Sequence, residues 1–335
     1  MRNFTSSDIT VVIPTYNAAK TIAPLLESIF LQKPLPGEVV IVDDASTDDT
    51  ISVAKRYSVR ILAQDKNGGA ARSRNIGISQ AKGKIILFLD SDTCLMPSVI
   101  QNVINGFNKN ADIHAINGYC YYKPLNKGWV ALYKGLVENS WADLVEDWAD
   151  DSKCINARIG AFTKASLLEM GGFDERYRGA YVEDHEFGIR YSKKYKIFFS
   201  KGLIVKHHFS NFFETVKNYW NRTCGTMELV DRYKGVLDSG GVSMSSAVQY
   251  LLGATLISFP IAFIMPIFWI AWVFLAGLYI FSIRRLLKRF FSNGPIFGIF
   301  CIALHAFYGV VIVTAGIFYN LSKMIKGGSL SMSLT

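Results

Sequence analysis

The sequence predicts an α/β protein in which helices cover a mostly parallel central sheet, followed by an amphipathic segment and transmembrane helices. Three observations lead to this class. Short β-branched runs alternate with helix-like segments in the first hundred residues, three of these runs end in acidic or aromatic residues, and long uncharged stretches occupy the last third. Apolar strands separated by helices are typical of parallel sheets that are covered on both faces.

The expected elements follow one another closely along the chain. Strands are short apolar runs, and helices carry apolar residues at helical spacing. In the first part we expect strands at 9–13, 39–42, 59–62 and 85–89, and helices at 19–30, 50–57 and 69–81. Beyond these the pattern is mixed, with strands at 113–122, 197–199 and 203–206, helical stretches at 129–148, 182–193 and 211–233, and a turn at 171–174.

The ends of three expected strands point to one ligand site. In open α/β sheets, ligands bind in the crevice outside the carboxyl ends of the strands. The candidate residues at these ends are Pro14, Tyr16, Asp43, Asp44, Asp90 and Asp92. Because the ends of parallel strands meet at one edge, we expect these side chains to lie close together.

Asp90-Ser91-Asp92 is the candidate metal site. Mg²⁺ and Mn²⁺ take oxygen ligands and usually share them with substrate phosphates. A metal here would neutralise a departing diphosphate. Turns and helix caps also favour Asp and Ser, but the position after a buried strand, together with the other motifs, favours the metal.

Two further segments suit a nucleotide. A carboxylate of Asp43-Asp44 can accept a hydrogen bond from a base N–H or a ribose hydroxyl, while Ser46 or Thr47 can cap the following helix. Asn67-Gly68-Gly69, followed by Arg72 and Arg74, resembles a phosphate cradle at a helix start, although glycine turns with arginines are also common on plain surfaces.

Acidic residues also open the helix expected at 182–193. Transfer to a hydroxyl needs a base, and Asp184 or Glu183 could remove the proton. The plainer explanation is that carboxylates in a first helical turn complement the helix dipole. His207 is a second-tier candidate for binding the metal or the diphosphate.

Taken together, these motifs resemble the family 2 glycosyltransferases, whose nucleotide-binding fold is called GT-A, over roughly residues 8–210. The matching segments, in chain order, are 11–17, 41–48, 74–77, 90–92, 171–175 and 183–184. The resemblance implies that Asp44 meets the base of a nucleotide-diphosphate sugar, that Asp92 is the usual metal ligand and that Asp184 is the catalytic base. It also implies inversion at the sugar carbon in one in-line displacement.

Charge and composition indicate a membrane surface. The 335 residues are 50% hydrophobic with a formal net charge of +9. Nucleic acid could explain this charge, but the basic residues crowd the apolar C-terminal stretches, which favours a bilayer with anionic lipid and no nucleic acid. The polar N-terminus shows no secretory signal, and the five scattered cysteines form no metal-type pair, so we expect a cytosolic catalytic domain.

Two uncharged stretches, 247–283 and 295–322, are each long enough to cross a bilayer. Pro260 and Pro266 divide the first stretch, and a hairpin of two short passes would return the basic residues of 284–289 to the cytosol. We therefore expect three passes, with two as the alternative. The aromatic and basic residues of 211–240 suit an interfacial helix, although a core-facing helix can have the same composition.

The expected organisation is a catalytic domain at 1–210, an interfacial segment at 211–240, a transmembrane region at 247–322 and a tail at 323–335. The C-terminal third resembles the membrane-bound branch of the family, in which His305 and Tyr308-Gly309 match a short element of the last span. Processive synthases carry a Gln-x-x-Arg-Trp motif that the segment around Arg222, a second-tier candidate, lacks. We therefore expect transfer of a single sugar to a lipid-linked acceptor.

This organisation is that of a multi-pass protein of a bacterial or archaeal plasma membrane, acting in glycan or polysaccharide synthesis. One alternative is a polyprenyl-phosphate sugar synthase, whose acceptor is already ionised and needs no base. An alternative of another class is an inactive membrane scaffold or nucleotide-sugar sensor.

Overall fold

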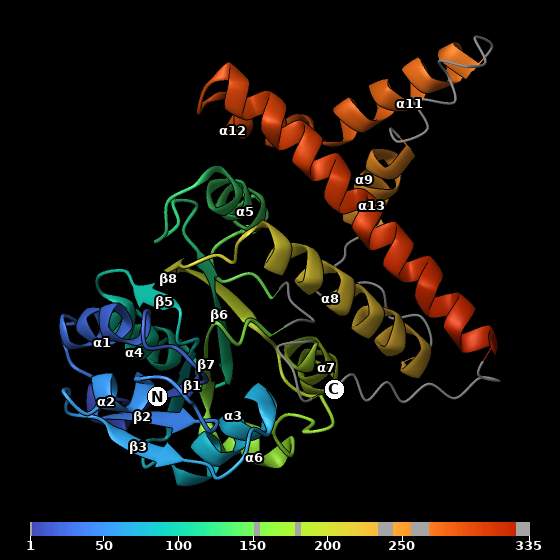
Figure 1. The fold of residues 1–335 in the computed structure, drawn as a ribbon. Coiled ribbons are helices and arrows are strands. Elements are labelled where there is room, and N and C mark those ends of the chain that lie inside the picture. The colour runs from blue at the N-terminus through green and yellow to red at the C-terminus, as the bar shows by residue number, and fades with distance from the viewer. Residues whose placement is uncertain (1, 151–154, 178–181, 234–243, 256–267, 326–335) are drawn as a thin grey trace. The chain divides into compact units, whose positions relative to one another are not determined.

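The computed structural model describes residues 2–150, 155–177, 182–233, 244–255 and 268–325 (Figure 1). Contacts divide the chain into two compact units, one of Met1–Phe209 with Ser239–Gly241 and one of Ser210–Asp238 with Val242–Thr335. The first unit is built on a β-sheet, and the described part of the second unit consists of helices.

Within the described residues, eight strands form one sheet in the order β3-β2-β1-β4-β7-β6-β8-β5. The strands are β1 (Ile9–Thr15), β2 (Glu38–Asp43), β3 (Arg60–Ala63), β4 (Ile85–Leu89), β5 (Thr93–Leu95), β6 (Ala115–Cys120), β7 (Ile159–Thr163) and β8 (Phe198–His207). Strands β3, β2, β1 and β4 are parallel, whereas β7 is antiparallel to β4 and β6, and β5 is antiparallel to β8. The α/β class is confirmed, but the sheet is mixed because the regular strand–helix alternation ends after β4.

Helices cover both faces of this sheet. The helical elements are η1 (Ser6–Asp8), α1 (Ile22–Phe30), α2 (Thr50–Ala54), α3 (Gly69–Gln80), α4 (Val99–Lys109), α5 (Trp129–Asn139), α6 (Lys164–Glu169) and α7 (Glu183–Tyr191). On one face Val11 packs in a cluster with residues of α1 and α4, and on the other face Val12 packs with residues of α3, α6 and α7. Burying one such aliphatic side chain contributes roughly 1.5–3 kcal/mol, so β1, buried along its whole length, anchors the sheet.

Two expectations for the first unit are wrong. The helical stretch expected at 129–148 ends as a helix at Asn139. The strands expected at 197–199 and 203–206 form one strand, β8. Ser200-Lys201-Gly202 resembles a turn, but β8 accommodates it in an irregular register against β6, between the pairs Asn117–Phe199 and Tyr119–Ile204.

The helices of the second unit pack closely. They are α8 (Phe212–Arg232), α9 (Met244–Thr255), α11 (Phe268–Ser282), α12 (Arg284–Phe291) and α13 (Pro295–Ile325). Asp231 of α8 accepts hydrogen bonds from Tyr319 Oη at 3.0 Å and Lys323 Nζ at 2.7 Å on α13. A Cβ on Gly309 of α13 would lie 2.6 Å from the carbonyl oxygen of Tyr250, so the glycine permits close approach of α9. His305 lies between the rings of Tyr250 and Tyr279, at centroid distances of 5.1 and 6.2 Å.

Among the described helices, α13 is the one long and apolar enough to cross a membrane by itself. A second candidate span is the pair Trp269–Ser282 and Arg284–Phe291, which is bent by 72°. Pro260 and Pro266, on which the expected hairpin depends, lie outside the described residues, so the number of passes stays a prediction.

Candidate active site

The loops after β1 and β2 are joined into one platform. Asn17 has a positive φ of 48°, which lets its Oδ1 accept a hydrogen bond from Thr47 N at 2.8 Å while its own N–H donates to Ser46 Oγ at 2.9 Å. Beside them, Pro14 lies within the buried strand β1 and Tyr16 is 51% exposed. An exposed ring on a rigid loop is suited to contact a planar base.

The paired aspartates at the end of β2 have different surroundings. Asp44 accepts hydrogen bonds from the backbone N–H groups of Gly68 and Gly69, at 2.7 and 2.8 Å, and from Gln64 Nε2 at 3.0 Å. It therefore fixes the start of α3 to the end of β2. Asp43 Oδ1 is buried and has no hydrogen-bond partner among the described residues. Of the two, Asp43 has the oxygen that is left to accept a further hydrogen bond.

Arg74 on α3 bridges two candidate motifs. Its guanidinium donates to Asp90 Oδ1 at 3.0 Å and to Glu183 Oε1 at 2.8 Å, and it lies 5.4 Å from the centroid of the Phe173 ring. Burial alone would lower the pKa of Arg74, but the carboxylates of Asp90 and Glu183 raise it well above its ordinary value. Arg74 is therefore always charged. It joins Asp90, directly after β4, to the first turn of α7.

Arg158, which the sequence did not single out, lies on the other side of Asp90. Its Nε is 4.0 Å from Asp90 Oδ2, and its Nη1 donates to Glu138 and to Cys120 Sγ. Burial opposes ionisation of Glu138, but Arg158 and then Lys134 lower the pKa of that carboxyl far below its ordinary value. Both oxygens of Asp90 thus face arginines, which favours a positioning role for Asp90.

Asp92 and His207 are brought together by the sheet. Strand β5 begins directly after Asp92, and its residue Thr93 is paired with His207 at the end of β8. His207 Nε2 lies 3.2 Å from Asp92 Oδ1, without the geometry of a hydrogen bond. Burial would raise the pKa of Asp92, but His207 and Arg158 lower it. Asp92 is therefore a carboxylate at neutral pH, beside a ring nitrogen.

The segment 171–175 is anchored to α3 as well. Asn75, next to Arg74, donates to the carbonyl oxygen of Phe173 and to Glu175 Oε1, both at 2.9 Å. Gly172 has a φ of 66°, and a Cβ there would lie 2.4 Å from Asn75 Oδ1, so only glycine fits. Asp184 lies in the first turn of α7 and accepts a hydrogen bond from His185 N at 2.9 Å.

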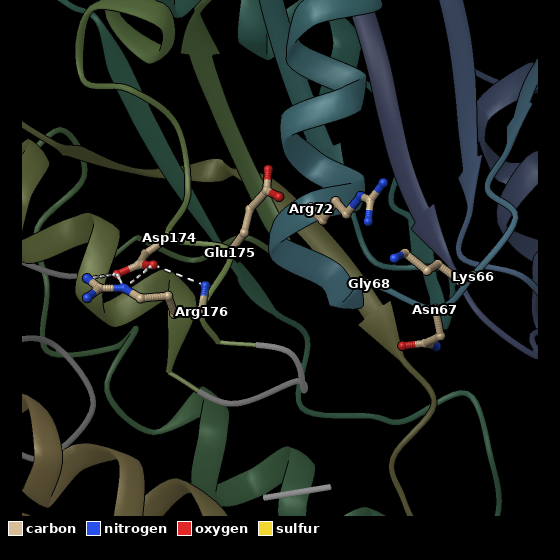
Figure 2. Close-up of a pocket in the computed structure, with 7 residues that line it drawn as sticks. All are labelled: Lys66, Asn67, Gly68, Arg72, Asp174, Glu175 and Arg176. Carbon is tan, nitrogen blue, oxygen red and sulfur yellow. Dashed lines mark hydrogen bonds and ion pairs between the residues drawn. The ribbon is translucent and has the colours of Figure 1, made fainter. Parts of the chain in front are cut away.

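A polar cavity of about 420 Å³ lies beside the start of α3 (Figure 2). Its lining consists of Lys66, Asn67, Gly68, Arg72, Asp174, Glu175 and Arg176. Figure 2 shows residues at the start of α3 on one side and residues 174–176 on the other, with Arg176 bonded to Asp174. The expected phosphate cradle therefore borders a cavity in the structure.

Residues 10–162 match the model of the family described as Glycosyl transferase family 2. This part of the chain is therefore similar to the family 2 glycosyltransferase domain. This is the domain of a transferase enzyme, and its mixed sheet gives the GT-A-like α/β fold that the sequence led us to expect.

Two curated relatives and one solved structure illustrate the likeness. An uncharacterised glycosyltransferase of Haemophilus influenzae is 29% identical over 189 residues, covering 54% of this chain and 61% of the relative. The succinoglycan biosynthesis protein ExoO of Rhizobium meliloti is 39% identical over 100 residues, covering 29% of each chain. The mannosyltransferase PcManGT of Pyrobaculum calidifontis, in complex with GDP-Man and Mn²⁺, has a TM-score of 0.53 at 16% identity, covering 93% of this chain and 87% of that one. The chain therefore spans less than two thirds of the length of these two curated relatives, and the solved structure supports its fold alone.

Two side chains of this domain could serve as ligands of a divalent metal. Among the described residues there is no cluster of three or more His, Cys, Asp or Glu side chains that could hold a metal by itself. Asp92 Oδ1 is a buried oxygen without a hydrogen-bond partner in the described chain, and His207 Nε2 is adjacent to it. Mg²⁺ and Mn²⁺ sites usually take one or two protein ligands and complete their shell with water and substrate phosphates. These two side chains fit such a metal.

The structure brings five of the predicted site residues into two contacting groups. Direct contacts join Arg74 to Asp90 and Glu183, and His207 lies next to Asp92. Arg222 lies on α8, in the second unit. It is therefore not among the side chains that the first unit assembles.

Proposed function

We propose that this protein is an inverting, metal-dependent glycosyltransferase that moves one sugar from a nucleotide-diphosphate donor to a lipid-linked acceptor at a membrane. The observation that carries the proposal is the bridge of Arg74 between Asp90 and Glu183. This contact supports the proposal because one guanidinium binds both Asp90 of the candidate metal motif and Glu183, the neighbour of the candidate base Asp184.

The donor would lie across the ends of β1 and β2. Tyr16 would contact the base, and Asp43 would accept a hydrogen bond from it, since the oxygens of Asp44 already hold the start of α3. This assignment differs from the one that the family resemblance implies. Asp92 and His207 would hold Mn²⁺ or Mg²⁺, which supplies Lewis-acid stabilisation of the departing diphosphate.

The acceptor hydroxyl would be deprotonated by Asp184. Glu183 is held by Arg74 and nearly buried, which leaves its neighbour as the better base. Asp90, held between Arg74 and Arg158, would orient the donor sugar. A positioned base of this kind typically contributes 10²–10⁴-fold to the rate.

The second unit would hold the acceptor at the membrane, with 1–210 as a cytosolic catalytic domain, 211–240 at the interface, 247–322 as the transmembrane region and 323–335 as a tail. An uncharged helix such as α11, with Ile270 83% exposed and Phe274 64% exposed, suits contact with acyl chains. The family relative ExoO is a succinoglycan biosynthesis protein, which supports a role in polysaccharide synthesis.

The test is a transfer assay on the purified full chain in detergent. UDP-, GDP- and dTDP-sugars are supplied with membrane lipid extract and with Mn²⁺, Mg²⁺ or a chelator. We expect metal-dependent formation of a lipid-linked product from one donor, and a loss of roughly 100-fold or more in Asp92→Asn and Asp184→Asn. The matched control is Asp112→Asn, an exposed carboxylate in the loop before β6.

Two results would count against the proposal. If product forms with chelator present, the metal assignment fails. If Asp184→Asn transfers sugar at the rate of the unmodified chain, the acceptor needs no base, and an already ionised polyprenyl phosphate becomes the better acceptor.

A further inference from the structure

Helix α12 has two chemically different faces. Leu286 and Phe290 are buried in the second unit, whereas Arg284, Arg285 and Lys288 are exposed. The three exposed cations are therefore turned away from the core of the unit and are available to a partner.

The chain provides few carboxylates for these cations. The sequence has no Asp or Glu after Asp238, so α9, α11, α12 and α13 contain none. Helix α8 differs, because its three basic residues are balanced by three acidic ones. Its basic residues are Lys217, Arg222 and Arg232, and its acidic residues are Glu214, Glu228 and Asp231. The basic residues of α8 are therefore balanced within their own helix, whereas those of α12 are left to bind an external anion.

Apolar surface lies on both sides of α12. In α11, Phe281 is 62% exposed, and the Arg284 guanidinium carbon lies 4.3 Å from the centroid of its ring. In α13, Ile296 is 72% exposed and Ile299 is 63% exposed. A ligand that covers this surface needs an anionic head beside hydrocarbon chains, which a nucleic acid or an acidic peptide does not offer.

We infer that α12 binds the phosphate headgroups of anionic glycerophospholipids, whose acyl chains lie against the exposed faces of α11 and α13. This inference rests on the proposed membrane attachment and is independent of the sugar-transfer reaction. It assigns the attraction for anionic lipid to α12 and excludes α8, although the sequence suggested both. Each basic residue near an anionic surface is worth about fivefold in binding.

The test measures lipid selectivity of the purified full chain. The protein in detergent is given equal amounts of phosphatidylglycerol and phosphatidylcholine, and the bound lipids are counted by native mass spectrometry. We expect a preference for phosphatidylglycerol that falls by about tenfold or more in Arg284→Gln/Arg285→Gln/Lys288→Gln. The charge-preserving variant Arg284→Lys/Arg285→Lys should keep it, which separates charge from misfolding.

The matched control removes three charges from α8, as Lys217→Gln/Arg222→Gln/Arg232→Gln, and should leave the preference within about twofold. An equal loss in this control would overturn the inference, because the attraction would then depend on net charge. The inference would also be overturned if the unmodified chain showed no preference for phosphatidylglycerol. Displacement of the lipid by glycerol 3-phosphate at similar concentration would overturn it too, because it would indicate a site for soluble phosphate. Sugar transfer is measured separately, so its failure leaves this result interpretable.

Discussion

Replacing Arg74 by methionine is expected to destabilise the first unit strongly. The guanidinium is 5% exposed and forms ion pairs with Glu183, also 5% exposed, and with Asp90, 30% exposed. Methionine has similar length and can pack on the ring of Phe173, so the main effect is the loss of charge. Arg74→Met leaves the Glu183 carboxylate buried without its arginine.

The magnitude follows from this burial. Removing one partner of a buried ion pair costs about 3–5 kcal/mol, whereas the more exposed Asp90 adds at most about 1 kcal/mol because solvent screens it. For a domain of this size, each kcal/mol lowers the melting temperature by about 2–4 °C. We therefore expect the melting temperature of the full chain to fall by roughly 6–24 °C.

A double-mutant cycle isolates the pair. Arg74→Met, Glu183→Gln and the combined variant are compared by thermal and urea unfolding, and the combined variant should recover about 2–3 kcal/mol relative to the sum of the single changes. A single Arg74→Met that unfolds like the unmodified chain, or a coupling energy near zero, would refute the argument that Arg74 joins the two motifs.

Three other changes test separate features. Arg158→Gln should lower the free energy of unfolding by about 1–3 kcal/mol, which is less than for Arg74→Met, because Lys134 still contacts Glu138. Urea unfolding measures this decrease. Burial would raise the pKa of the Glu38 carboxyl, but hydrogen bonds lower it below its ordinary value of 4.5. The stabilisation of the fold by this carboxylate is therefore fully present above pH 4.5 and is lost as the pH falls through the lowered pKa. The stability difference between the unmodified chain and Glu38→Gln should therefore shrink on acidification, and a difference that grows would be contrary evidence. Gly172→Ala should cost roughly 1–3 kcal/mol from the positive φ and displace Asn75, which thermal unfolding and proteolysis of the loop would detect.

The sequence identified the parallel half of the sheet well. Buried parallel strands are short continuous apolar runs, so residues 39–42 and 85–89 were recognisable without any knowledge of the tertiary structure. The strand Ile159–Thr163 was missed because Ile-Gly-Ala-Phe-Thr lacks both alternation and a β-branched majority. Helix α4 was overlooked despite regular apolar spacing from Val99 to Phe107, a signal that could have been found.

The site was less predictable than the fold, because two of its contacts depend on strand pairing. His207 lies beside Asp92 only because β8 pairs with β5, and no local pattern contains that information. Arg158 meets Asp90 because β7 runs antiparallel to β4. Asp44 was expected to meet the base, and its hydrogen bonds to Gly68 and Gly69 could not be anticipated from the order of the motifs.

The pairing of β5 with β8 also sets an order of assembly during synthesis. Strands β1 to β4 are contiguous in the chain and can form early, because contacts between near neighbours in sequence close with little entropic cost. Among the described strands, β8 is the last to leave the ribosome, and it pairs with both β5 and β6. A nascent chain that ends before β8 would already contain the loops after β1 and β2 but would lack His207, the neighbour of Asp92. Under the proposed function, donor binding and metal retention would therefore be acquired at different chain lengths.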